Sequence, residues 1–155
     1  MPAEHSAYLI VEQICSRLAT VVAGTTYHNT LRERNVSKTL RSFDELAKAD
    51  MPLVQVLVNR LPGGPLVAQR RDEGDLEISL VCWTQGSEPE YMQRDILRLA
   101  RDVIVCLLAD CTLGATCRVI RVTEIVTDEG SLAYEGYAMA EISMTANYAW
   151  SWSAP

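Results

Sequence analysis

Long hydrophobic runs, histidine and phenylalanine are all scarce in this chain of 155 residues. The longest apolar stretch, Val103 to Ala109, is far shorter than the roughly 20 residues that a helix needs to cross a bilayer. Residues Met1 to His5 do not show a basic region followed by an apolar one, which is the pattern of a signal peptide. We therefore expect no membrane anchor and no secretion signal. The ordinary hydrophobic fraction of 48% predicts a globular domain with a substantial core.

Recognisable catalytic and metal-binding motifs are also missing. The two histidines, His5 and His28, lie outside any sequence motif of a nucleophile and its base. Gly63-Gly64 is not followed by the lysine and hydroxyl residue of a phosphate-binding loop. The acidic run Asp72 to Asp75 lacks the length and the closing glutamate of a calcium loop. We therefore expect no enzyme activity, no cofactor and no metal.

Five cysteines form an odd set without the spacing of zinc ligands. Periodicity places Cys15 and Cys106 on apolar helix faces and Cys82 within an apolar strand, so we expect small buried side chains in a reducing compartment. A small cysteine enzyme stays an alternative, because catalytic partners can meet in space, and it requires one thiol with a lowered pKa. The remaining two cysteines are Cys111 and Cys117.

The net charge of −6 is unevenly distributed along the chain. Residues 32–71 carry eight basic and four acidic side chains, whereas residues 72–155 carry five basic and fourteen acidic ones. A ring assembled head to tail can use such a division, because faces of opposite sign select a partner copy and its orientation. Chance variation along the chain is the alternative. An acidic protein is also a poor candidate for tight, non-specific DNA binding.

Hydrophobic periodicity predicts the order of the secondary-structure elements. Apolar residues recur every three or four positions in two segments, which indicates amphipathic helices from Ser6 to Val22 and from Glu90 to Asp110. In the first of them Ser6 is the expected N-cap and Gly24 the expected stop. The other expected elements are a short strand from Leu31 to Ser37, a short helix from Ser42 to Ala49, and strands from Leu53 to Val58 and from Leu76 to Thr84. A terminal hairpin is expected from Cys117 to Tyr148. Its two strands run from Arg118 to Val126 and from Ala138 to Tyr148, and its turn is at Asp128-Glu129-Gly130.

The second helix has a clear inward stripe. Asp102 and three arginines lie largely off that stripe, and the spacings Asp95–Arg98 and Arg98–Asp102 predict surface ion pairs. The stripe consists of Met92, Ile96, Leu99, Val103, Cys106 and Leu107.

These elements predict an α/β fold of the α+β kind, with a mixed or antiparallel sheet of about four to five strands and two main helices on one face. We expect one domain over residues 1–149, followed by a tryptophan-containing tail over residues 150–155. Within the domain, Arg60 to Asp75 holds two prolines, three glycines and a charge cluster, which predicts a protruding loop or hairpin arm.

Two features are candidate contacts for a neighbouring subunit or partner. The paired Arg70 and Arg71 lie on the predicted loop, and the alternative interpretation is a solvated turn. The two C-terminal tryptophans are either exposed anchors for a partner or side chains that cap the core. The complete set of candidate interface residues is Arg60, Arg70, Arg71, Asp72, Glu73, Trp150 and Trp152.

The order of elements resembles that of the tail terminator family of long-tailed bacteriophages, also called tail completion or minor tail proteins. An N-terminal helix leads into a basic polar strand and a proline-led apolar strand. A variable loop, a further strand and a long helix ending near Asp110 follow. The Leu113-Gly114 step and a terminal hairpin, whose aliphatic last strand runs from Ile142 to Tyr148, complete the pattern.

This resemblance implies a structural virion protein that is assembled in the bacterial cytoplasm and located at the head-proximal end of the tail. Such a subunit forms a hexameric ring that caps the tail tube, stops its polymerisation and joins the tail to head-completion or neck proteins. The tail sheath is a further candidate partner, and DNA passes through the lumen. The family has no catalytic residues to transfer. The alternative is a non-catalytic adaptor domain, monomeric or dimeric, that binds a partner through the Arg70-Arg71 loop or the tryptophan tail.

Overall fold

Five strands form one mixed sheet in the order β1-β2-β3-β5-β4. The computed structural model describes residues 6–39, 41, 45, 50–60 and 71–151. Strand β1 runs parallel to β2, and the other three neighbouring pairs are antiparallel. The strands are β1 (Val36–Ser37), β2 (Leu53–Arg60), β3 (Arg71–Gln85), β4 (Val119–Thr127) and β5 (Tyr137–Ser151).

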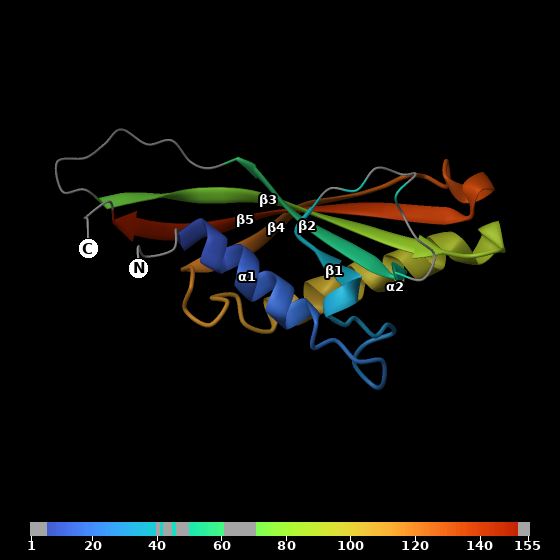
Figure 1. The fold of residues 1–155 in the computed structure, drawn as a ribbon, viewed down its shortest axis with the longest axis horizontal. Helices are drawn as coiled ribbons and strands as arrows, with labels where there is room; N and C mark the ends of the chain where they lie inside the picture. Colours follow the sequence, from blue (N-terminus) through green and yellow to red (C-terminus); the bar gives the residue numbers. More distant parts are fainter. Residues whose placement is uncertain (1–5, 40, 42–44, 46–49, 61–70, 152–155) are drawn as a thin grey trace.

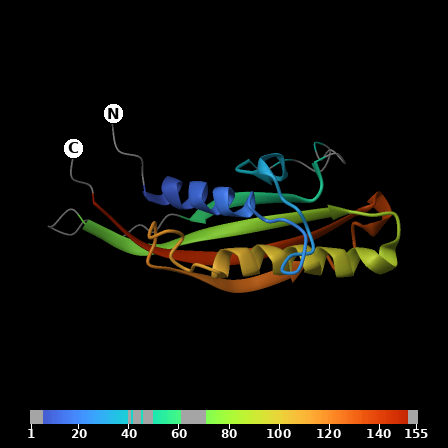
Figure 2. The same cartoon turned by 90° about the horizontal axis from the view of Figure 1, so that it is seen from below.

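Both long helices pack on the same face of this sheet, as Figures 1 and 2 show. Helix α1 spans Ser6–Leu18 and helix α2 spans Pro89–Leu108. Their apolar faces and one face of the sheet form the main core, in which each fully buried large apolar side chain is worth about 1.5–3 kcal/mol. The predicted fold class, a mixed sheet with two main helices on one face, is confirmed.

Helix α2 matches its predicted inward stripe, because all six residues of that stripe are buried. Pro89 occupies the first turn, where its missing N–H costs no helical hydrogen bond. The prediction was wrong for Asp102, which was placed off the stripe but is fully buried. Neither expected ion pair with Arg98 forms, since Asp95 instead pairs with Arg94 at 3.2 Å and Asp102 with Arg101 at 3.4 Å.

Helix α1 is shorter than predicted. It ends at Leu18, and Val22 is 63% exposed instead of joining the buried stripe. The Thr20 hydroxyl donates to the Arg17 carbonyl oxygen at 2.6 Å. This bond and the β-branched run that follows both disfavour further helix. Gly24 is therefore not the helix stop.

The strand expected from Leu31 to Ser37 is mostly absent. A 3₁₀ helix spans Glu33–Asn35, and only Val36 and Ser37 form β1. The buried Asn35 side chain accepts a hydrogen bond from the Arg32 amide and donates to the Asp50 carbonyl oxygen, which favours a turn here. The helix expected from Ser42 to Ala49 falls largely outside the described residues.

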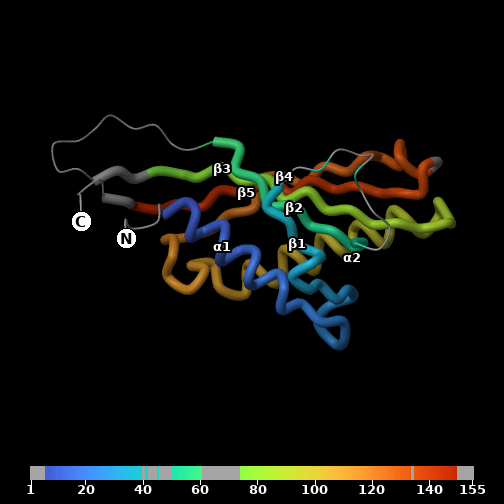
Figure 3. Tube along the Cα trace, viewed as in Figure 1, coloured from blue at the N-terminus to red at the C-terminus, as the bar shows by residue number. Residues whose placement is uncertain are grey.

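Strands β3 and β5 form a long two-stranded ribbon, visible side by side in Figure 3. Their pairing runs from Gln85 opposite Tyr137 to Arg71 opposite Ser151. Two predicted boundaries are therefore corrected. Residues 71–75 are strand and not loop, and the last strand continues through Trp150 to Ser151, so the tail does not begin at residue 150. Residues 61–70 and 152–155 lie outside the described residues.

The terminal hairpin has both of its predicted strands. Their connection, residues 128–136, contains the predicted turn and then a 3₁₀ helix, Ala133–Glu135. Glu129 and Gly130 adopt positive φ angles of 54° and 81°, as a tight turn requires. On β5, inward Ile142, Met144 and Ala146 alternate with outward polar residues as expected.

Among the described residues, the sheet face opposite the helices is covered at one end. There a small second core includes Leu53, Val81, Trp83 and Tyr137. The buried amide of Gln55 accepts a hydrogen bond from the Trp83 indole at 3.0 Å. The rest of this face is mostly polar, which is the normal pattern for a sheet with one wet side.

Candidate functional site

Of the predicted interface residues that the structure describes, those on β3 and β5 lie at the end of the sheet, whereas Arg60 of β2 is opposite Glu77, near the middle of β3. Arg60 is the last residue of β2. Its side chain is 72% exposed, and its guanidinium is 3.9 Å from the Glu77 carboxylate. Arg71, Asp72 and Glu73 begin β3, where Asp72 is directly opposite Trp150 of β5. The structure therefore brings residues 71–73 and Trp150 together through backbone pairing. Arg70 and Trp152 lie outside the described residues.

The uncovered sheet face beyond these residues carries linked polar side chains. Asn59 donates to the Ser79 hydroxyl at 2.5 Å, and this hydroxyl donates to the Glu141 carboxylate at 2.6 Å. Further along the ribbon, Asn147 donates to Asp75 at 2.9 Å. These bonds cross from β2 to β3 and from β3 to β5, so they hold the side chains of three strands in fixed positions.

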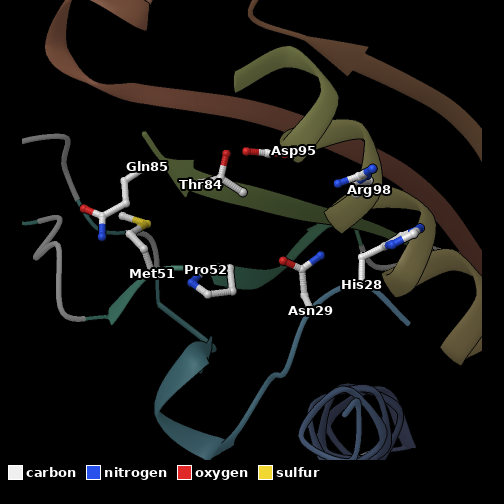
Figure 4. Close-up of a pocket in the computed structure, with 8 residues that line it drawn as sticks. All are labelled: His28, Asn29, Met51, Pro52, Thr84, Gln85, Asp95 and Arg98. Atoms are coloured by element: carbon white, nitrogen blue, oxygen red, sulfur yellow. The ribbon is translucent and has the colours of Figure 1, made fainter. Parts of the chain in front are cut away.

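A polar pocket of about 220 Å³ lies on the helix side of the sheet. Figure 4 shows that its walls come from α2, from the residues just before β2, from the connection after α1 and from the end of β3. The Thr84 hydroxyl is buried and has no hydrogen-bond partner among the described residues. The lining residues are His28, Asn29, Met51, Pro52, Thr84, Gln85, Asp95 and Arg98.

Buried Asp102 positions one wall of this polar pocket. Its Oδ2 atom accepts hydrogen bonds from the backbone amides of His28 and Asn29, both at 2.8 Å, and from the Asn29 side chain at 2.9 Å. Arg101 adds a bond from its guanidinium to the Thr26 carbonyl oxygen at 3.0 Å. Helix α2 thus fixes the connection that follows α1, although that connection has no regular secondary structure of its own.

Sequence reasoning missed both the pocket and Asp102. One signal was present, because Asp102 lies three residues after Leu99 and four before Cys106, which is the spacing of the buried stripe. An acidic residue at such a position must find hydrogen-bond donors, because an unpaired buried charge is very costly. The donors lie more than 70 residues earlier, on Asn29 and its neighbour, and no local pattern identifies them.

A second acidic residue organises the loop after α2. Asp110 accepts hydrogen bonds from the Thr112 hydroxyl and from the backbone amides of Gly114 and Thr112, and it lies 2.6 Å from the Arg17 guanidinium of α1. These donors, the Thr112 hydroxyl first, hold the pKa of the Asp110 carboxyl well below its ordinary value. The loop and both helices are joined at this point.

Burial raises the pKa values of four cysteine thiols. Burial raises the pKa of Cys82 to about 12 and that of Cys15 to about 11. Burial, with the nearby Asp110 carboxylate, raises the pKa of Cys117 to about 11, and burial raises that of Cys106 as well. These four thiols are therefore poorly suited to act as nucleophiles at neutral pH.

Within the described residues, no group of three or more histidine, cysteine or acidic side chains is arranged to hold a metal ion. None of the helices described is both long and apolar enough to span a membrane.

Comparison with known proteins finds neither a matching family model nor a matching curated protein.

Proposed function

We propose that this chain is a structural subunit of a bacteriophage tail, a tail terminator that forms a ring on the end of the tail tube. The observation that carries the proposal is the fold itself. A mixed sheet with two helices on one face, ending in a long terminal hairpin, is the architecture expected from the resemblance in element order. The expectation was made from the sequence, so the agreement supports the resemblance.

The chemistry of the side chains favours a structural role over a catalytic one. Four of the five thiols have raised pKa values, which argues against the alternative of a cysteine enzyme. The uncovered sheet face carries Asp75, Glu77, Glu124 and Glu141 against Arg60 and Arg121, so acidic side chains are in excess. An acidic surface of this kind suits a lumen through which DNA must pass without sticking, because like charges repel and phosphate binding requires Lys and Arg.

The proposed contact surface now differs from the one expected from the sequence. The adaptor alternative used the Arg70-Arg71 loop or the tryptophan tail as its contact, and Trp150 of that tail belongs to β5, where it pairs with Asp72 of β3. The end of the β3–β5 ribbon is then the surface that meets the tail tube or a neck protein, with Arg60 of β2 further along the sheet, opposite Glu77. In this proposal the ring has two unlike axial faces, and the ribbon end belongs to one of them.

The test measures assembly in two ways. Native mass spectrometry of the purified protein should show a ring, with a hexamer as the expected species. Electron microscopy of phage tails made with and without this chain should show capped tubes of uniform length in its presence and tubes of irregular, extended length in its absence. A protein that stays monomeric and whose removal leaves tube length unchanged would contradict the proposal.

A further inference from the structure

The sheet has two open edges that differ from each other. On one side β4 is the outer strand, and on the other side β1 pairs only with Val54 and Gln55 of β2. Among the described residues, no strand pairs with the outer side of β4 or with residues 56–60 of β2 on its β1 side. Unpaired amide and carbonyl groups on such edges are templates for a further strand. Two unlike edges on opposite sides of a sheet suit a head-to-tail assembly.

The side chains along the two edges are complementary. Val58 of β2 is 43% exposed, and Ile125 and Val126 of β4 are 47% and 49% exposed. An exposed charge lies beside each apolar group, and the two charges are opposite: Arg60 on β2 and Glu124 on β4. Apolar and opposite-charge pairs across neighbouring strands are the contacts that stabilise a sheet.

We propose that β4 of one copy pairs with β2 of the next copy as antiparallel strands, with Arg60 opposite Glu124, Val58 opposite Ile125 and Leu57 opposite Val126. The inference deepens the proposed function, since it names the contact that closes the ring and rests on the chain forming one.

The register follows from the faces on which these residues lie. Opposed residues of neighbouring strands share a face. Val58 is opposite Ile78, and Ile125 is opposite Ile142, so both lie on the helix side of the sheet. Arg60 is opposite Glu77, and Glu124 is opposite Ser143, which places both charges on the other side.

A bulge in β2 is necessary for this match. The register of β2 against β3 shifts between Val58 and Arg60, so that Asn59 is an extra residue. The Asn59 side chain reaches Ser79 and Arg60 lies near Glu77, which shows that both side chains are on the helix-free face. Without the extra residue, Arg60 and Val58 would lie on one face and could not match the alternating faces of Glu124 and Ile125.

The lengths of the strands agree with the same register. If Leu57 is opposite Val126, the next pair is Val56 opposite Thr127. Thr127 is the last residue of β4, and Val56 is the first residue of β2 that β1 leaves open. The chain after β1 then turns toward the helix-free face, where the Thr39 carbonyl oxygen accepts a hydrogen bond from the Gln55 side chain. An incoming β4 therefore fits the open part of the edge without displacing β1.

The strand directions agree with cyclic symmetry. Strand β4 runs antiparallel to β2 within one copy, because each of the three intervening pairings is antiparallel. A rotation about an axis roughly along the strands preserves their direction, so β2 of the next copy is also antiparallel to β4. A two-fold contact between two β4 strands would instead give a closed dimer and leave β2 open.

Cross-linking tests the pairing. We would combine Val58→Cys with Ile125→Cys in a background with Cys15→Ser and Cys111→Ser, which removes the two native cysteines that are only half-buried. A short bismaleimide should produce a ladder of covalent oligomers on a denaturing gel. The matched control replaces Val58→Cys with Val22→Cys, since Val22 is 63% exposed but lies on neither edge. The control should give no ladder.

Charge exchange is the second measurement. Arg60→Glu and Glu124→Arg should each raise the dissociation constant of the oligomer at least about fivefold, and the double variant should return to within about twofold of the parent protein. Analytical ultracentrifugation provides these constants. Because Arg60 also lies near Glu77, Glu124→Arg is the cleaner of the two single changes.

The outcomes separate this inference from the proposed function. Native mass spectra could show a ring while the cross-linking gives no ladder or the double charge exchange restores no affinity. Either result would overturn the edge pairing but not the proposal that the chain forms a ring. A covalent dimer formed by Ile125→Cys alone would indicate β4–β4 contact and would also overturn it. A chain that remains monomeric up to its solubility limit and on tail tubes would overturn both proposals.

Discussion

The Oδ2 atom of Asp102 lies 2.8 Å from the backbone nitrogen of His28, 74 residues earlier in the chain. The same oxygen accepts two further hydrogen bonds from Asn29, and Asp102 itself is fully buried. A buried carboxylate with this many donors ties helix α2 to an irregular connection that forms part of the polar pocket. Because the carboxylate is shielded from water, the loss of its acceptor would leave two backbone amides without their partner.

We predict that Asp102→Ala lowers the free energy of unfolding by about 2–4 kcal/mol, because unsatisfied buried donors add to the loss of charged hydrogen bonds. Urea denaturation followed by circular dichroism measures the change. Asp95→Ala on the same helix is the control, since the Asp95 side chain is 43% exposed and, among the described residues, pairs with neighbouring Arg94. Its cost should stay within about 0.5 kcal/mol. Equal costs for the two variants would contradict the anchoring role of Asp102.

Asp102 also marks where sequence reasoning succeeded and where it failed. Helix α2 and the strands of the terminal hairpin could be predicted, because their apolar periodicity is long and uninterrupted. The burial of Asp102 could have been deduced from the same spacing, but charged side chains are exposed by default. Its partners are set by tertiary packing and could not be deduced from local sequence.

The candidate interface shows a second limit. Residues 71–75 hold a glycine and four charged side chains, which favours a loop on local propensity, yet all five pair with β5. Strand propensity depends on what a residue pairs with, and here the partner is the end of β5 with Trp150. The polar pocket could not be predicted at all, because its walls come from four separate parts of the chain.

Asp110 should make stability depend on pH in acid. Its folded pKa is lowered, chiefly by the Thr112 hydroxyl and the Gly114 and Thr112 amides, with Arg17 contributing. A lowered carboxyl pKa adds stability that is fully present above the unfolded pKa of about 4 and is lost as the pH falls toward the folded value. We therefore predict that Asp110→Asn is less stable than the parent protein at pH 7, and that this gap narrows steadily from about pH 5 to pH 2.

The measurement is the urea midpoint of both proteins across that pH range. Arg17→Met is the companion variant, because it removes one donor to Asp110 and leaves the Thr112 and Gly114 donors in place. The difference in stability between Arg17→Met and the parent protein should be smaller than that between Asp110→Asn and the parent protein. If the stability difference between Asp110→Asn and the parent protein did not change with pH, these donors would not stabilise the charged form of the Asp110 carboxylate.

Two buried hydroxyls of β3 should respond to removal in opposite directions. The Ser79 hydroxyl bonds to Asn59 and Glu141, whereas the Thr84 hydroxyl has no partner among the described residues. We predict that Ser79→Ala lowers the free energy of unfolding by about 1–2 kcal/mol. Thr84→Val should raise it by about 1 kcal/mol, because a methyl group replaces a hydroxyl that is buried without a bond. A loss for Thr84→Val as large as that for Ser79→Ala would contradict the prediction.

The loop after α2 contains strain that glycine can relieve. Leu113, Gly114 and Ala115 all adopt positive φ angles, of 49°, 67° and 67°. For a residue with a Cβ atom this conformation costs about 1–2 kcal/mol, whereas glycine adopts it freely. Leu113 is fully buried, so its side chain fills the core and its substitution would create a cavity. Ala115 is exposed and carries the strain without that compensation.

We therefore predict that Ala115→Gly raises the free energy of unfolding by about 0.5–1 kcal/mol, since the relief of strain exceeds the greater entropy of glycine in the unfolded chain. Ala23→Gly is the matched control. Ala23 is also exposed and outside helix and strand, but its φ angle is not positive. This control should lose stability, because only the entropy term remains. If both variants lowered the free energy of unfolding, the positive φ angle would cost Ala115 nothing. The consecutive left-handed residues after α2 would then store no strain.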